Sequence, residues 1–113
     1  ISVSDFPKAK EFYLKALAPL GIKCVFEGEG YYGFGVTRPM FWIADGGSHV
    51  SKTHVAFSAK SQDEVKAFYD AALGAGGKDN GAPGLRPEYH EKYYGAFVFD
   101  LDGNNIEAVF GNA

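Results

Sequence analysis

Glu107 is the residue whose surroundings most need a chemical explanation. It lies between Ile106 and Ala108 in a mostly apolar segment, 105–110, which predicts a strand. An unpaired carboxylate is costly to bury in such a strand, so a metal ion, an arginine or solvent must compensate its charge. Two interpretations stay open: a functional carboxylate, or a strand residue that faces solvent or forms a salt bridge.

The histidines offer partners for that carboxylate. His54 begins a predicted strand. A histidine and a carboxylate on facing strands, together with a second histidine, would make a 2-His-1-carboxylate set suited to Fe(II), Mn(II), Ni(II) or Zn(II). The alternative is that His54 is simply the first residue of a strand and has no functional role. His90 lies in a loop before Tyr93, where it could gate a cleft or act as a catalytic acid or base, or be an ordinary loop residue. We expect His49 to be exposed.

The chain has two arginines, Arg38 and Arg86. A guanidinium can bind a substrate carboxylate or phosphate through two parallel hydrogen bonds. Surface positions without a role are the ordinary alternative for both. Arg86 is included among the candidate substrate-binding residues.

Aromatic residues supply candidate stacking surfaces. Tyrosine pairs fall on two predicted strands, Tyr31 with Tyr32 and Tyr93 with Tyr94. Because neighbours on a strand point to opposite faces, one of each pair should pack in the core while the other lines a cleft. Tyr94 and Trp42 are our candidates for substrate binding.

Composition limits the possible classes of protein. The 113 residues, 46% hydrophobic and 16% aromatic, suit one domain with a packed core. Fourteen acidic residues outnumber eleven basic ones, and no basic run favours nucleic acid as a partner. No apolar stretch approaches the roughly 20 residues that span a bilayer. One cysteine, Cys24, predicts no internal disulfide, which favours a cytoplasmic location. The start at Ile1 suggests that a few natural residues precede it.

The chain repeats itself at an offset of 56 residues. Seven identities appear without a gap, among them the match of Phe12 and Tyr13 with Phe68 and Tyr69. A second match, of 31–33 with 93–95, needs a slightly larger offset. The chain is therefore predicted to contain two copies of one unit, about 1–47 and 52–113.

Periodicity predicts the same order of elements in each copy. A strand (1–4 or 54–59) precedes a helix, with Asp5 or Ser61 as N-cap. Copy one continues with strands near 22–27, 31–37 and 40–44, and copy two with strands at 93–99 and 105–110. Segment 78–88 is expected to be looser, with a mobile glycine-rich flap at 81–84.

These segments resemble a known family over essentially the whole chain. ISVSDFPKAKEFYLKALAPLG, THVAFSAKSQDEVKAFY and YYGAFVFDLDGNNIEAVF are similar to the vicinal oxygen chelate superfamily, which includes glyoxalases, bleomycin resistance proteins and extradiol dioxygenases. Leu101 departs from the proline that is usual before DGN. The resemblance implies an α+β fold in which two βαβββ repeats form a curved, cleft-bearing mixed sheet, with a helix packed on each half. It also implies a homodimer.

The resemblance further implies a divalent metal (Fe, Mn, Ni or Zn), held by side chains from the first and last strand of each copy. His54 and Glu107 match those positions in copy two, and Glu107 and His90 are the candidate catalytic residues. The copy-one match to His54 would precede Ile1. The match to Glu107 is Trp42 or Asp45, depending on register, and we favour Trp42.

Two functions follow from the resemblance. The first is a metal-dependent enzyme of glyoxalase or dioxygenase type, acting on a small molecule with adjacent oxygens. The second is a metal-free protein that sequesters a drug or metabolite, as bleomycin resistance proteins do, with Trp42 and the tyrosines as stacking surfaces.

Overall fold

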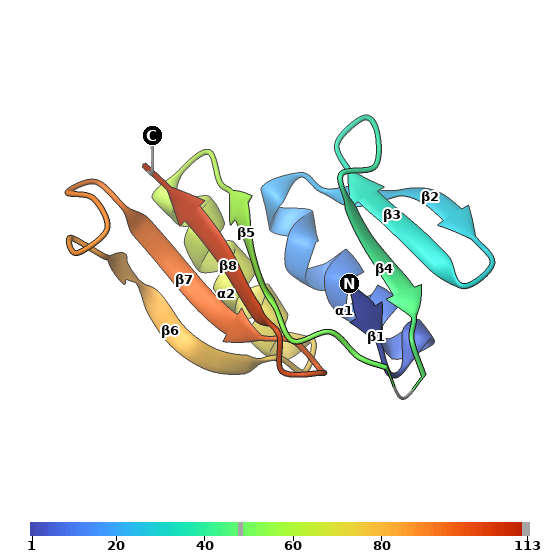
Figure 1. Cartoon of the computed structure of the whole chain (residues 1–113). Helices are drawn as coiled ribbons and strands as arrows, with labels where there is room; N and C mark the ends of the chain where they lie inside the picture. The colour runs from blue at the N-terminus through green and yellow to red at the C-terminus, as the bar shows by residue number, and fades with distance from the viewer. Residues whose placement is uncertain (48, 112–113) are drawn as a thin grey trace.

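The computed structural model describes residues 1–47 and 49–111, and divides them into two halves of similar construction (Figure 1). The first half contains β1 (Ser2–Val3), α1 (Phe6–Leu17), the short 3-10 helix η1 (Ala18–Leu20), β2 (Lys23–Gly28), β3 (Tyr31–Gly35) and β4 (Phe41–Asp45). The second half contains β5 (His54–Ser58), α2 (Gln62–Gly74), β6 (Lys78–Leu85), β7 (Tyr94–Phe99) and β8 (Asn105–Phe110).

Each half forms its own four-stranded mixed sheet. The strand orders are β1-β4-β3-β2 and β5-β8-β7-β6, so the two orders correspond strand for strand. The first strand pairs in parallel with the last in both sheets, and the remaining pairs are antiparallel. One helix packs on each sheet, and the two helices contact each other. The predicted α+β fold of two βαβββ units is confirmed, with its strands grouped in two sheets.

The helices begin where the sequence predicts. The Asp5 side chain accepts a hydrogen bond from the Lys8 backbone N–H at 3.2 Å, and Ser61 accepts one from Glu64 at 3.1 Å. Each cap satisfies a donor that the first helical turn leaves free. Helix α1 then buries an apolar stripe against the first sheet and α2, which consists of Ala9, Phe12, Tyr13, Ala16 and Leu17. None of the described helices has the length and apolar character needed to cross a membrane.

The prediction of a loose segment at 78–88 was wrong for most of its length. Strand β6 occupies Lys78–Leu85 and pairs with β7, although the register shifts on both sides of Gly81. Gly81 has a φ of 149°, which residues with a side chain rarely adopt, and a glycine there permits such an irregularity. Pro83 is tolerated because β6 is the edge strand of its sheet. The glycine and proline content therefore marks an irregular edge strand.

A buried polar network joins the two halves at Asp100. The Tyr13 hydroxyl of α1 donates to Asp100 Oδ2 at 2.5 Å, and Asn104 Nδ2 donates to the same oxygen at 2.9 Å. The backbone N–H groups of Asp102 and Asn104 donate to Oδ1. Asp100 is 6% exposed and Asn104 is fully buried, so these donors compensate a charge that water cannot reach.

The network predicts that Tyr13→Phe destabilises the fold. It removes one of two side-chain donors from a buried carboxylate, so we expect the free energy of unfolding to fall by about 2 kcal/mol in a urea titration. Tyr69→Phe is a matched control, because the Tyr69 hydroxyl donates to Asp79 at 3.0 Å on an exposed surface. The control should change little. Equal losses in the two variants would contradict the special role of Asp100.

Candidate functional site

Glu107 lies on the face of β8 that points away from α2. Its neighbours Ile106 and Ala108 belong to the hydrophobic core beneath the sheet, so the alternation of the strand places Glu107 on the opposite face. The residue is nevertheless only 1% exposed. Its carboxylate must therefore find its partners within the protein.

Two side chains satisfy that carboxylate. His54 Nε2 lies 2.7 Å from Glu107 Oε1, and the Tyr93 hydroxyl donates to Oε2. The register explains the first contact: Ala56 of β5 is the partner of Glu107, and His54 lies two residues earlier on the same face. The His54 side chain is 52% exposed, so it forms the solvent-facing side of the pair.

Gly95 allows the Tyr93 ring to fold back toward Glu107. A Cβ at Gly95 would lie 3.2 Å from Tyr93 Cε1 and 3.6 Å from Glu107 Oε2. The pKa of Tyr93 is raised above its ordinary value, first by burial and then by the hydrogen bond to Glu107 and the carboxylate charge. The Tyr93 hydroxyl therefore stays protonated across the neutral pH range and continues to donate its hydrogen bond to Glu107.

The structure reverses our assignment within the tyrosine pair. Tyr94, predicted to bind substrate, is buried in the core together with Ala96 and Val98. Its placement corrects that prediction, and Tyr93, the other member of the pair, contacts Glu107. The signal was available, because counting back by twos from the apolar residues 96 and 98 places Tyr94 on the core face.

Arg86 lies beside this group, whereas His90 does not contact it. The Arg86 guanidinium carbon lies 5.4 Å from the centre of the Phe97 ring. The centres of the His54 and Phe97 rings are 6.3 Å apart. A cavity of about 250 Å³ borders Arg86 and Phe97. His90 is exposed, and its Nδ1 accepts a hydrogen bond from the Lys92 backbone N–H at 3.1 Å. The predicted catalytic role of His90 is therefore not supported by any side-chain hydrogen bond with His54, Tyr93 or Glu107.

The parallel strand pairs place Trp42 in the first sheet where Glu107 lies in the second. Ser2 pairs with Ala44, and Ser58, its repeat equivalent, pairs with Val109. Trp42 lies two residues before Ala44, as Glu107 lies two before Val109. The register of the parallel pairs thus agrees with the Trp42 alternative and not with Asp45. The antiparallel pairs shift the match by two residues, because Gly33 faces Trp42 while its repeat equivalent Gly95 faces Val109.

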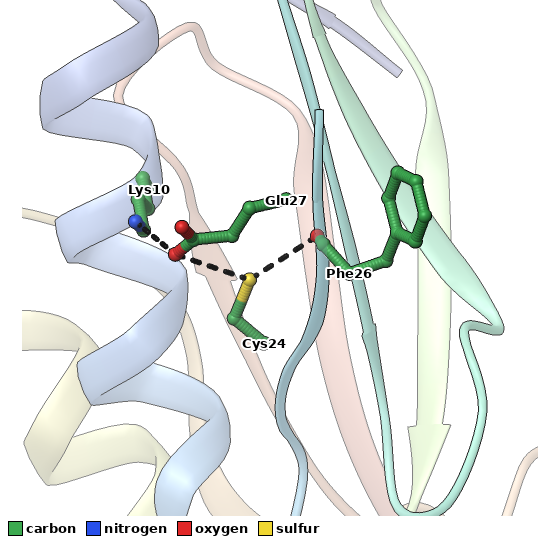
Figure 2. Close-up of polar contacts among 4 residues, drawn as sticks. All are labelled: Lys10, Cys24, Phe26 and Glu27. Atoms are coloured by element: carbon green, nitrogen blue, oxygen red, sulfur yellow. Dashed lines mark hydrogen bonds and ion pairs between the residues drawn. The ribbon is translucent and has the colours of Figure 1, made fainter. Parts of the chain in front are cut away.

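Trp42 belongs to an exposed aromatic cluster with Phe26 and Tyr31. The three ring centres are 5.7 to 5.9 Å apart, and each residue is more than 40% exposed. Figure 2 shows the Phe26 ring on the side of β2 opposite to the polar contacts of Lys10 and Glu27. The corresponding faces of the two sheets are therefore chemically different: aromatic in the first half, and polar in the second.

A larger cavity, of about 420 Å³, lies between the halves. Its lining is apolar apart from Ser58 and Lys60, and it includes Phe41 from β4 and residues 55–57 from β5. None of the predicted site residues lines it. Two of its lining residues adjoin the polar group: Val55 follows His54 in the chain, and Ala56 is the strand partner of Glu107.

The sequence matches one family over nearly its whole length. The profile of the Glyoxalase/Bleomycin resistance protein/Dioxygenase superfamily covers residues 1–108. The chain belongs to this superfamily. A comparison with curated proteins gives no match.

Solved structures of the superfamily share the fold. A glyoxalase/bleomycin resistance protein from Albidiferax ferrireducens is 28% identical with a TM-score of 0.84, over 97% of this chain and 92% of that one. Lactoylglutathione lyase from Agrobacterium tumefaciens is 20% identical, with a TM-score of 0.70 over 99% and 90%. A glyoxalase I variant from Zea mays is 22% identical, with a TM-score of 0.68 over 96% of this chain and 44% of that one.

The donor atoms of this superfamily member fit two positions of a metal site. An imidazole nitrogen and a carboxylate oxygen 2.7 Å apart are ligands that Fe, Mn, Ni and Zn accept. Within residues 1–47 and 49–111, no third histidine, cysteine, aspartate or glutamate joins them to form a cluster. Trp42 supplies no donor from the first half. A complete metal site therefore needs at least one further ligand.

The Glu107 contacts predict how Tyr93 titrates. By NMR of tyrosine Cζ, Tyr93 should ionise well above the ordinary tyrosine pKa of about 10. Since the folded protein keeps this proton longer than the unfolded chain, the stabilisation is fully present below about pH 10 and is lost as the pH rises further. Glu107→Gln should lower the pKa part of the way, because burial remains.

Glu29→Gln, in the exposed turn between β2 and β3, serves as the control and should leave the Tyr93 titration unchanged. If Tyr93 titrates identically in the wild-type protein and the Glu107→Gln variant, the contact between them does not exist in solution.

Proposed function

We propose that this chain is a metal-dependent enzyme of glyoxalase or dioxygenase type, acting on a small molecule with neighbouring oxygen atoms. The observation that supports it is the convergence of His54 and Glu107, from different strands, on the face of the second sheet opposite to its helix. Membership of the superfamily adds to this, as does the likeness in fold to a lactoylglutathione lyase.

The residues of this chain would have separate tasks. His54 and Glu107 would hold the ion, which when bound supplies Lewis acidity to a coordinated oxygen. Tyr93 would orient the carboxylate, since its hydroxyl already fixes Oε2 and leaves Oε1 toward His54. The half-exposed imidazole keeps this side of the group open to a ligand. The proposal requires at least one ligand beyond these two.

A metal-free binding protein is the second candidate. It is favoured by Trp42, which stands where a second carboxylate would be, and by the exposed rings of Phe26 and Tyr31 around it. In that case the contact between His54 and Glu107 would be a polar contact of the binding surface. Flat ligands would stack on the aromatic cluster.

Metal content distinguishes the two candidates. Protein purified without a histidine tag is loaded in turn with Mn(II), Fe(II), Ni(II) and Zn(II), desalted and measured by mass spectrometry. We expect about one equivalent of a preferred metal, and at least tenfold weaker binding in His54→Ala and Glu107→Gln, because each removes a ligand.

His49→Ala is the matched control, since His49 is exposed and is not among the side chains that contact Glu107, and it should bind metal as the wild type does. Less than about a tenth of an equivalent of every metal in the wild-type protein would refute the enzyme proposal and favour the metal-free binder.

A further inference from the structure

Arg86 is held in a fixed position over strand β6. Its Nη2 donates to the Ala82 carbonyl at 2.7 Å, and its Nη1 lies 3.4 Å from the Leu85 carbonyl. Two glycines make room for the guanidinium: a Cβ at Gly81 would lie 3.2 Å from Nη2, and one at Gly84 would lie 3.0 Å from Nη1. The local sequence of β6 thus supports this one arrangement of the side chain.

The fixed guanidinium has no anionic partner. Among the described residues no carboxylate lies within ion-pair distance of Arg86, although Glu88 borders the same cavity of about 250 Å³. Guanidinium has five N–H donors, and the two carbonyl contacts leave donors free for a ligand. Asn80 and Asn105, whose side chains are hydrogen-bonded to each other at 3.1 Å, also line this cavity. Its polar walls suit a small anion.

Phe97 connects this cavity to Glu107. It is the register partner of Glu107 on β8 and of Gly81 on β6, and it is 9% exposed. Its ring centre lies 5.4 Å from the guanidinium carbon and 6.3 Å from the centre of the His54 ring. Because β7 lies between β6 and β8 in the sheet, a flat ligand that crosses β7 at Phe97 would have the Arg86 cation on its β6 side and the His54 and Glu107 pair on its β8 side.

We propose that the site takes a small organic carboxylate with a flat unsaturated body, whose carboxylate binds Arg86 and whose far end carries an oxygen that reaches His54 and Glu107. The two-pronged geometry of guanidinium suits a carboxylate, and the Phe97 ring supports both the cation and the ligand. This assignment of substrate class rests on the proposed function for the chemistry at His54 and Glu107. The anion site itself needs no metal.

A matched pair of ligands tests the proposal on the metal-free protein. The probes are 4-hydroxybenzoate and its neutral amide, 4-hydroxybenzamide, which differ in charge and hardly in shape. In NMR titrations we expect the acid to shift the Arg86 Nε–H and Asn80 side-chain signals. We expect it to bind about tenfold more tightly than the amide, since a charge-assisted contact is lost in the amide.

Variants locate the binding. Arg86→Gln should abolish the preference for the acid, whereas Arg38→Gln, which removes an exposed arginine in the turn after β3, should preserve it. Arg86→Lys should keep only part of the preference, because an ammonium lacks the planar fork. Circular dichroism verifies folding, and the comparison of acid with amide on the wild-type protein stands without any variant.

Equal binding of acid and amide to the wild-type protein, or a preference unchanged by Arg86→Gln, would overturn the proposal. Because no metal is present, these outcomes are independent of the metal measurement. If the protein binds no metal but still prefers the acid to the amide, it is a carboxylate-binding protein and not a metal-dependent enzyme.

Discussion

The burial of one carboxylate constrains the second half of this protein. Glu107 is 1% exposed on a strand whose other face packs in the core, and a charge in that place destabilises the fold unless donors surround it. Two side chains surround it: His54, at the start of β5, and Tyr93, just before β7. Gly95 lets the tyrosine ring approach. The parallel register of β5 and β8 fixes this convergence.

Duplication produced two similar frames with different faces. Both halves use the same strand order and the same helix placement, yet Trp42 stands in the first where Glu107 stands in the second. One face presents three exposed rings, and the other presents a carboxylate, an imidazole and a guanidinium. The Asp100 network, which receives the Tyr13 hydroxyl of the first half, ties the two frames together.

Much of the architecture could be predicted from the sequence because it depends on local signals. The repeat, the caps at Asp5 and Ser61 and the core face of the helices all follow from side-chain type and spacing. The irregular strand β6 was missed because its pairing depends on β7, whereas its glycines and proline locally favour a loop.

The candidate site was predicted only in part, because some of its contacts depend on residues that are distant in the sequence. The apolar neighbours of Glu107 in the sequence show that it needs a partner. The choice of Tyr93 over Tyr94 depends on the alternation of β7, in which Tyr94 shares the core face with residues 96 and 98. The fixed position of Arg86 depends on the absence of Cβ atoms at Gly81 and Gly84 and on the Phe97 ring beneath it, none of which a single segment reveals.

The proposed site depends most on the meeting of the His54 imidazole with the Glu107 carboxylate, and a crystal structure of the protein grown with Mn(II) tests this contact most directly. We predict that Nε2 and Oε1 face each other on the side of the second sheet away from α2, either in direct contact or with an anomalous Mn peak between them. A His54 ring turned into solvent, with Glu107 paired to a different group, would contradict the account.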